Sequence, residues 1–104
     1  MPDRSAFSAI ADPTRRAILD CLQDGELCAG DIAERFPVSR PAIARHIKVL
    51  RSAGLLNERR QAQKRIYALR PEGLRDVDRW LQTYRQFWAT RLIDLKAFVE
   101  NSDE

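Results

Sequence analysis

Basic side chains concentrate in the middle of the sequence. Between Arg40 and Arg65 there are eight lysines and arginines and one acidic residue, Glu58, which gives this segment a formal charge of +7 in a chain of net charge +3. The eight are Arg40, Arg45, Lys48, Arg51, Arg59, Arg60, Lys64 and Arg65. Cations clustered between less basic flanks are typical of a surface that binds a polyanion such as nucleic acid. A solvated arginine-rich surface would have the same composition, so the choice depends on the elements that present these residues.

Few residues could perform catalysis or bind a metal ion. His46 is the single histidine, and no acid, nucleophile or second histidine is set beside it, so we expect no enzymatic activity. The two cysteines, Cys21 and Cys28, are too few for a disulfide framework or a four-ligand zinc site, and they indicate a reducing compartment. We therefore expect neither a metal nor a cofactor. A redox switch between the two thiols is the alternative, although Cys21 lies on an apolar helical face, where a buried thiol is usually inert.

The length of 104 residues allows one domain, which we place at residues 1–100, before a polar tail, 101–104, that we expect to be disordered. No apolar run approaches the roughly 20 residues that span a membrane. The N-terminal residues lack the apolar stretch of a signal peptide. These features predict a cytoplasmic protein with no membrane partner.

Capping and breaking residues predict short helices in the first half of the chain. Asp12 followed by Pro13 is typical of a helix N-terminus, and Gly25 follows this helix. A shorter amphipathic segment precedes it. Another helix is expected at about 29–36, where Pro37 ends it because proline cannot continue the backbone hydrogen bonds.

The helix predicted at 40–53 has two contrasting faces. Ser39 is a suitable N-cap, and Gly54 ends the helix. Ile43, Ile47 and Leu50 recur at the spacing of a buried helical face. The opposite face holds Pro41, Ala44, Arg45, Lys48 and Ser52. A basic face with a small residue at its centre suits close approach to a negatively charged partner.

Two short strands and a long helix complete the chain. Strands are predicted at 55–60 and 64–69, and a helix at 71–100 would be about 45 Å long at 1.5 Å per residue. Its apolar residues follow nearly heptad spacing and, with extra aromatic residues, form a stripe wider than a small domain needs. They are Leu74, Val77, Leu81, Tyr84, Trp88, Leu92, Leu95 and Val99, widened by Trp80, Phe87 and Phe98. A second copy of the chain is the simplest partner for this stripe, and a small-molecule pocket lined by the aromatic residues is the alternative.

A mainly α chain with a small β-hairpin, in this order of elements, is a winged helix-turn-helix with a long C-terminal dimerisation helix. The sequence also resembles the ArsR/SmtB-type bacterial transcriptional repressors from about residue 7 to residue 99. The resemblance lies in the segments ADPTRRAIL (11–19), GEL (25–27), DIA (31–33), VSRPAIARHIKVL (38–50), AGL (53–55) and PEGL (71–74). It implies a homodimer held by the first and last helices, with a recognition helix at 40–53 and a wing at 55–69. It also implies repression through a pseudo-palindromic operator, commonly at the promoter of the protein's own gene.

DNA contacts are expected from the recognition helix and the wing. Arg40 and Arg45 are the candidates for reading bases, because arginine can bind guanine through two hydrogen bonds, and Lys48 is the candidate for a phosphate. The full predicted set is Ser39, Arg40, Ala44, Arg45, His46, Lys48, Arg59, Arg60, Lys64 and Arg65. Which member of each adjacent wing pair faces DNA is left open, because neighbours on a strand point to opposite faces. His46 is left open between the edge of the core and a phosphate contact.

Dimer contacts are expected from the first and last helices. The predicted set is Phe7, Ile10, Leu74, Val77, Leu81, Tyr84, Trp88, Leu92, Leu95 and Val99. These positions follow from the apolar stripe and from the arrangement that the resemblance implies.

The chain departs from the metal-sensing branches of the family that it resembles. Cys28 stands where one branch has the first of two metal-binding cysteines, but Gly30 stands where the second would be. The last helix has Asp76 and Asp78 but lacks the histidines of a branch that binds zinc there. Metal sensing is therefore not expected, and the effector is left unassigned. The alternative function is a winged-helix adaptor that grips an acidic protein instead of DNA.

Overall fold

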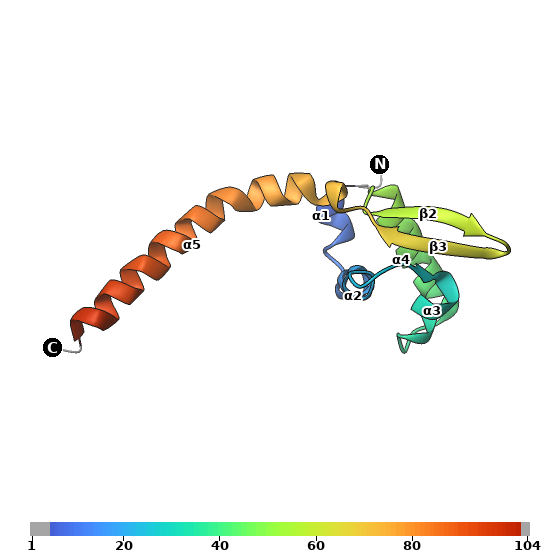
Figure 1. The fold of residues 1–104 in the computed structure, drawn as a ribbon, viewed down its shortest axis with the longest axis horizontal. Helices are drawn as coiled ribbons and strands as arrows, with labels where there is room; N and C mark the ends of the chain where they lie inside the picture. The colour runs from blue at the N-terminus through green and yellow to red at the C-terminus, as the bar shows by residue number, and fades with distance from the viewer. Residues whose placement is uncertain (1–4, 103–104) are drawn as a thin grey trace.

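The computed structural model describes residues 5–102, and Figure 1 shows their arrangement. The helices are α1 (Ala6–Ala9), α2 (Pro13–Cys21), α3 (Ala29–Glu34), α4 (Arg40–Ser52), the 3-10 turn η1 (Pro71–Leu74) and α5 (Arg75–Ser102). The strands are β1 (Leu27–Cys28), β2 (Leu56–Gln61) and β3 (Lys64–Leu69). The short helices and the sheet gather into one body from which α5 projects, so the described part is 67 Å long and only 22 Å across its shortest axis. The predicted winged helix-turn-helix with a long C-terminal helix is confirmed.

The predicted caps begin α2 and α4. Asp12 accepts a hydrogen bond from the Arg15 backbone N–H at 3.1 Å, and Ser39 accepts one from the Ala42 N–H at 3.2 Å. Each cap is followed within two residues by a proline, whose missing N–H costs nothing in a first helical turn. Because these groups satisfy otherwise unpaired donors, the start of α4 is fixed in the body of the fold.

A single apolar core lies between the helices and the sheet. Ile18, Ile32, Ile43, Leu50 and Leu55 are its largest fully buried side chains. α4 contributes its predicted apolar face to this core, so the opposite face of the same helix must look outward. Burial of one face therefore determines which α4 side chains can meet a partner.

The sheet has one strand more than the sequence predicts. β1 pairs antiparallel with β3, placing Leu27 opposite Tyr67, and the strand order is β1-β3-β2. β2 runs one residue further than predicted, to Gln61, so a two-residue turn joins β2 to β3. Ala62 opens this turn with φ of 58°, in the left-handed region that Asn or Gly usually occupies in a tight hairpin.

The junction with the last helix also differs from prediction. Pro71–Leu74 is a 3-10 turn, and the α-helix starts only at Arg75. Here Gly73 passes so close to the preceding loop that a Cβ on it would lie 2.2 Å from the Gly54 carbonyl oxygen. α5 then continues through 101 and 102, so these two residues are helical and not part of a disordered tail. Residues 103–104 of that predicted tail lie outside the described residues, as do residues 1–4.

Candidate nucleic-acid interface

The outer face of α4 presents most of the predicted recognition-helix residues. Arg40, Ala44, Arg45 and Lys48 are exposed, and so is the capping residue Ser39. They are held outward because Ile43, Ile47 and Leu50 are buried on the opposite side of the helix. Arg40 is the first residue of α4, at the end of a recognition helix that commonly meets base edges.

His46 lies apart from that outer face. Its side chain is half-buried, and its Nδ1 lies 3.3 Å from Nη1 of Arg15 in α2. Arginine can only donate hydrogen bonds, so Nδ1 of His46 is the acceptor in this contact. Of the two interpretations that the sequence leaves open, this position favours the edge of the core.

The strand register divides the wing cations between two faces. Arg60 lies opposite Arg65, and Gln61 lies opposite Lys64. Residues opposite one another share a face and residues adjacent along a strand do not, so Arg60 and Arg65 share one face while Arg59 and Lys64 share the other. The sequence alone leaves this assignment open because it depends on a register that no motif specifies.

The wing face with Arg65 looks toward α4 across a groove. This groove has a volume of about 290 Å³ and includes Ala44, Lys48, Arg51, Glu58 and Arg65 in its lining. We call it the α4–wing groove. It brings a cation of the wing and a cation of the recognition helix to the same surface.

Glu58, the single acid of the basic segment, is bound by other side chains of the same chain. It accepts a hydrogen bond from the Tyr67 hydroxyl at 2.7 Å and forms an ion pair with Arg51. The hydrogen bond from Tyr67, followed by the nearby charge of Arg51, lowers the pKa of Glu58 below its ordinary value of 4.5. Glu58 therefore neutralises Arg51 and ties β2 to the C-terminal part of α4.

Among the described residues, the other cations of the surface form no direct ion pair, although Arg65 lies near enough to Glu58 for its charge to help lower the pKa of that carboxyl. Within residues 5–102, no ion pair involves Arg40, Arg45, Lys48, Arg60, Lys64 or Arg65. Arg60 and Arg65 are like charges placed directly opposite each other on neighbouring strands, an arrangement that costs free energy. The surface is therefore suited to an anionic partner.

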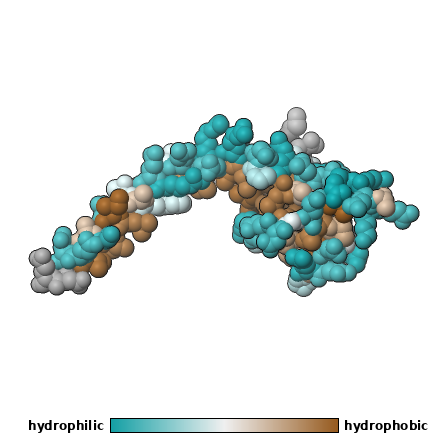
Figure 2. Space-filling view, viewed as in Figure 1, coloured by the Kyte–Doolittle hydropathy of each residue, from teal (hydrophilic) through white to brown (hydrophobic). Residues whose placement is uncertain are grey.

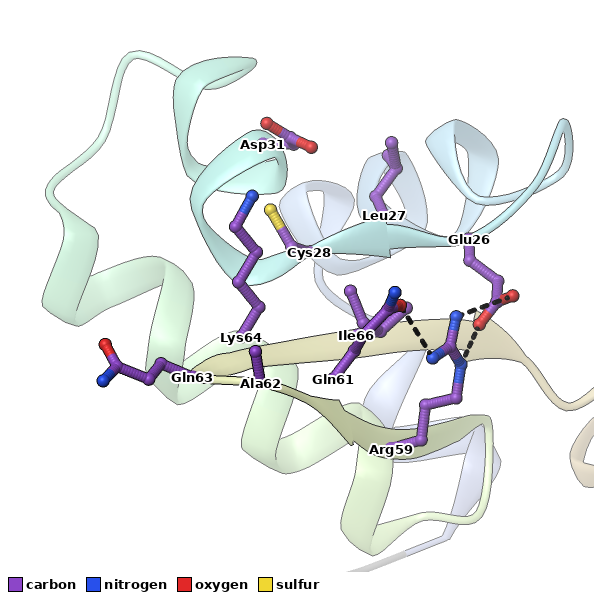
Figure 3. Close-up of a pocket in the computed structure, with 10 residues that line it drawn as sticks. All are labelled: Glu26, Leu27, Cys28, Asp31, Arg59, Gln61, Ala62, Gln63, Lys64 and Ile66. Atoms are coloured by element: carbon purple, nitrogen blue, oxygen red, sulfur yellow. Dashed lines mark hydrogen bonds and ion pairs between the residues drawn. The ribbon is translucent and has the colours of Figure 1, made fainter.

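Arg59 differs from the other wing cations because it forms an ion pair with an acid of its own chain. Figure 3 shows its guanidinium reaching Glu26, with Nε at 2.8 Å and Nη2 at 3.3 Å from the carboxylate oxygens. Its Nη1 also donates to Oε1 of Gln61 at 3.0 Å. The bond from Arg59 lowers the pKa of Glu26. Arg59 thus links β2 to the segment before β1.

The hollow beside Arg59 also contains one of the two cysteines. It is an open hollow of about 730 Å³ whose lining includes Cys28, Asp31 and Lys64 (Figure 3).

Cys21, in α2, donates to the Ile18 carbonyl oxygen at 3.1 Å, and burial raises the pKa of its thiol. Across residues 5–102, no group of three His, Cys, Asp or Glu side chains is placed to hold a metal ion.

A second unpartnered surface runs along α5. The predicted contact residues Tyr84, Trp88, Leu92, Leu95 and Val99 are all 45–66% exposed. Exposed Trp80, Phe87 and Phe98 extend this apolar surface beyond the predicted set, whereas exposed Ile93 lies on the opposite side of α5. Figure 2 shows hydrophobic residues gathered along the concave side of α5.

The predicted contact residues nearest the body of the fold have different surroundings. Val77 is only 8% exposed and packs in the chain's own core, so little of its side chain is left for a partner. Ile10, Leu74 and Leu81 are half-buried against that core. Phe7 is 41% exposed and packs edge-on against Trp80, with ring centroids 5.8 Å apart.

Three residues that hold these surfaces in place are not identifiable from sequence patterns. Arg15 binds α1 and His46, Glu26 binds Arg59, and Tyr67 binds Glu58. Charge and periodicity give no signal for such pairs, because the partners are far apart in sequence.

In residues 5–102, no helix is both long and apolar enough to cross a membrane.

Comparisons with known proteins agree with this geometry. Residues 10–59 match the model of a helix-turn-helix domain family. The chain is 41% identical over 80 residues to the transcriptional repressor SdpR of Bacillus subtilis, covering 77% of this chain and 89% of that protein. It is 39% identical over 107 residues to the HTH-type transcriptional regulator Rv2034 of Mycobacterium tuberculosis, covering 99% of this chain and 92% of that protein.

A solved structure shows the same fold. The crystal structure of the ArsR family transcriptional regulator RHA00566 matches with a TM-score of 0.71 at 32% identity, over 80% of this chain and 91% of that one. The chain belongs to the ArsR family of winged helix-turn-helix transcriptional regulators, which are DNA-binding proteins and not enzymes.

Proposed function

We propose that this protein is a homodimeric repressor that binds a pseudo-palindromic operator with α4 and the wing of each protomer. The observation that carries the proposal is the α4–wing groove, where Lys48 of α4 and Arg65 of the wing lie without a direct ion pair among the described residues. A DNA backbone supplies closely spaced phosphates for such cations, and base edges lie in the major groove beside it. Because α4 is exposed along its basic face, it is the element that can enter that groove.

The exposed residues divide into two roles in this proposal. Arg40 and Arg45 read bases, while Ala44 lets α4 approach the groove closely. Lys48, Arg60 and Arg65 bind phosphates, and Lys64 does so from the end of the wing, with Ser39 as an additional donor. Arg59 keeps the wing against β1 through Glu26, and His46 keeps α4 against α2.

The dimer is formed in this proposal through the exposed apolar surface of α5, together with Phe7 of α1. Beyond Leu81, all side chains described on α5 are exposed, so its aromatic and aliphatic residues have no cover from their own chain. Exposed apolar patches of this length indicate a protein partner. A second copy of the same helix offers a matching surface, and the two recognition helices would then meet half-sites about 10 bp apart or a multiple of that.

The protein would act in the cytoplasm, where the DNA of a bacterial cell lies. Its regulated promoters would commonly include that of its own gene, as the family resemblance implies. Occupation of an operator by the dimer would block transcription there.

Recovery of DNA fragments from the source genome by the purified protein tests this proposal. Fragments retained at low and at physiological salt would be sequenced for wild type, Arg45→Ala and Arg79→Ala. Arg79 is an exposed arginine of α5, so its substitution removes the same charge outside the α4–wing surface. We expect wild type and Arg79→Ala to retain a few fragments that share a palindrome at the higher salt, and Arg45→Ala to lose that preference.

Uniform recovery that disappears as salt rises would contradict the proposal. The affinity would then be the sequence-independent kind that any basic surface has for DNA. The adaptor function, with an acidic protein as partner, would become the better explanation.

A further inference from the structure

We infer that Arg15 and His46 form a link that sets the orientation of α4 relative to the dimer-forming helices, and thereby the operator spacing that the dimer accepts. Arg15 is a positioning residue in this account, because it acts through His46 and does not touch DNA itself. The inference rests on the proposed function of a homodimer that binds two half-sites. It assigns a role to the one histidine of the chain and to an arginine that the charge analysis does not single out.

Arg15 connects three helices with one side chain. From α2, its Nε donates to the Ala9 carbonyl oxygen at 2.7 Å and its Nη2 donates to the Ser8 carbonyl oxygen at 3.2 Å, both in α1. Its Nη1 donates to Nδ1 of His46 in α4 at 3.3 Å. A planar guanidinium has fixed angles between its donors, so these bonds constrain the direction of α4 relative to α1.

α1 in turn is joined to α5. Phe7 packs edge-on against Trp80 at 5.8 Å between ring centroids, and Trp80 lies 5.1 Å from Tyr84. Since α1 is only four residues long, its own hydrogen bonds cannot hold it in place. The contacts with Arg15 and Trp80 therefore form a continuous physical connection from the proposed dimer surface to the recognition helix.

Operator spacing is the property that such a connection would control. Each base pair added between two half-sites separates them by about 3.4 Å and turns one relative to the other by about 35°. A dimer whose α4 helices are held at one orientation tolerates little of this change. A dimer whose α4 helices can rotate against α1 would bind altered spacings almost as well as the natural one.

Substitutions at His46 test the link without altering the exposed face of α4. His46→Leu removes the acceptor but keeps an apolar side chain at a half-buried site. His46→Asn is the matched control, because an asparagine amide oxygen lies at about the same distance from the backbone as Nδ1. Both variants leave the bonds of Arg15 to α1 in place.

The measurement is the affinity for synthetic duplexes that carry the recovered half-sites at natural spacing and at one base pair more or less. We expect wild type and His46→Asn to lose about tenfold in affinity when the spacing changes, and His46→Leu to lose less than about threefold. Circular dichroism and sedimentation would show that the variants are folded dimers. If His46→Leu does not fold, His46→Phe makes the same comparison, because phenylalanine keeps a planar ring at this site but has no acceptor.

Equal spacing preference in wild type and in the variant without the acceptor would overturn the inference while leaving the proposed function intact. A wild-type protein without any preference for the palindrome would instead overturn the proposed function, and the inference with it. The binding of the wild-type protein to these duplexes is enough to distinguish the two failures.

Discussion

The α4–wing groove and the outer surface of α5 are both unpartnered, but they expose opposite chemistry. Around the groove, Lys48, Arg60 and Arg65 form no ion pair with an acid among the described residues. Along α5, Trp88, Leu92 and Leu95 are more than half exposed to water. A charged surface binds its partner with an affinity that falls as the salt concentration rises. An apolar surface binds its partner with an affinity that salt does not weaken. One chain can therefore encode two interfaces whose responses to salt differ.

The largest expected effect comes from placing charge in the apolar surface of α5. The double substitution Leu92→Glu and Leu95→Glu should abolish the dimer and lower operator affinity by at least about 100-fold, since buried charges at an interface centre cost several kcal/mol. Sedimentation velocity and duplex titration would measure both effects. Gln86→Glu is the control, because residue 86 lies on the opposite side of α5 from the apolar stripe. A stable dimer of the double variant would show that α5 is not the interface.

The junction between the two regions should be the next most sensitive position. Gly73→Ala should lower the free energy of unfolding by about 1–3 kcal/mol, because the added Cβ would collide with the Gly54 carbonyl oxygen. Urea unfolding would measure this loss. Gly30→Ala provides the control, since its Cβ would meet only the Cys28 sulfur at 4.0 Å and alanine favours a helix. Equal stability of the two variants would mean that η1 can move away from Gly54 without cost.

A smaller effect on DNA affinity should distinguish the cations on the two faces of the wing. Arg65→Ala should reduce operator affinity and lower the slope of log affinity against log salt by about 1, as expected for one lost phosphate contact. Arg59→Ala should leave that slope unchanged, because Arg59 is paired with Glu26. Fluorescence anisotropy across a salt series would measure both slopes. If Arg59→Ala lowered the slope and Arg65→Ala left it unchanged, the face of the wing beside β1 would be the one that contacts DNA.

The smallest effect concerns the pH dependence of stability at Glu58. Its pKa is lower in the folded state than the ordinary 4.5, so its contribution is present above that value and is lost as pH falls through the folded-state pKa. Tyr67→Phe removes the main cause of the lowered pKa and should reduce this loss on acidification, by less than about 1 kcal/mol. Urea unfolding at about pH 6 and about pH 3.5 would measure the change. An unaltered acid dependence would show that Arg51 alone holds the carboxylate ionised.

Local signals were sufficient to predict α4 and its two faces. Ser39 and Pro41 mark its start, Gly54 follows its end, and Ile43, Ile47 and Leu50 repeat at helical spacing. These features act over a few residues, so they can be read from sequence. The exposed positions of Arg40, Arg45 and Lys48 follow from the same periodicity.

Features that depend on long-range contacts could not be predicted in the same way. β1 has only two residues and no periodic pattern, and Ala62 is not a residue that signals a tight turn. The heptad stripe continues from Val77 to Val99, although Val77 is covered by its own chain. Spacing gives the apolar face of a helix but not the partner that covers each position.

The most direct test of the central claim is a titration of an operator duplex and a scrambled duplex with the protein over a salt series. We expect two protomers per operator, an affinity that falls linearly as log salt rises, and an excess of at least about a thousandfold over the scrambled duplex at physiological salt. Equal affinity for the two duplexes at every salt concentration would contradict a specific repressor.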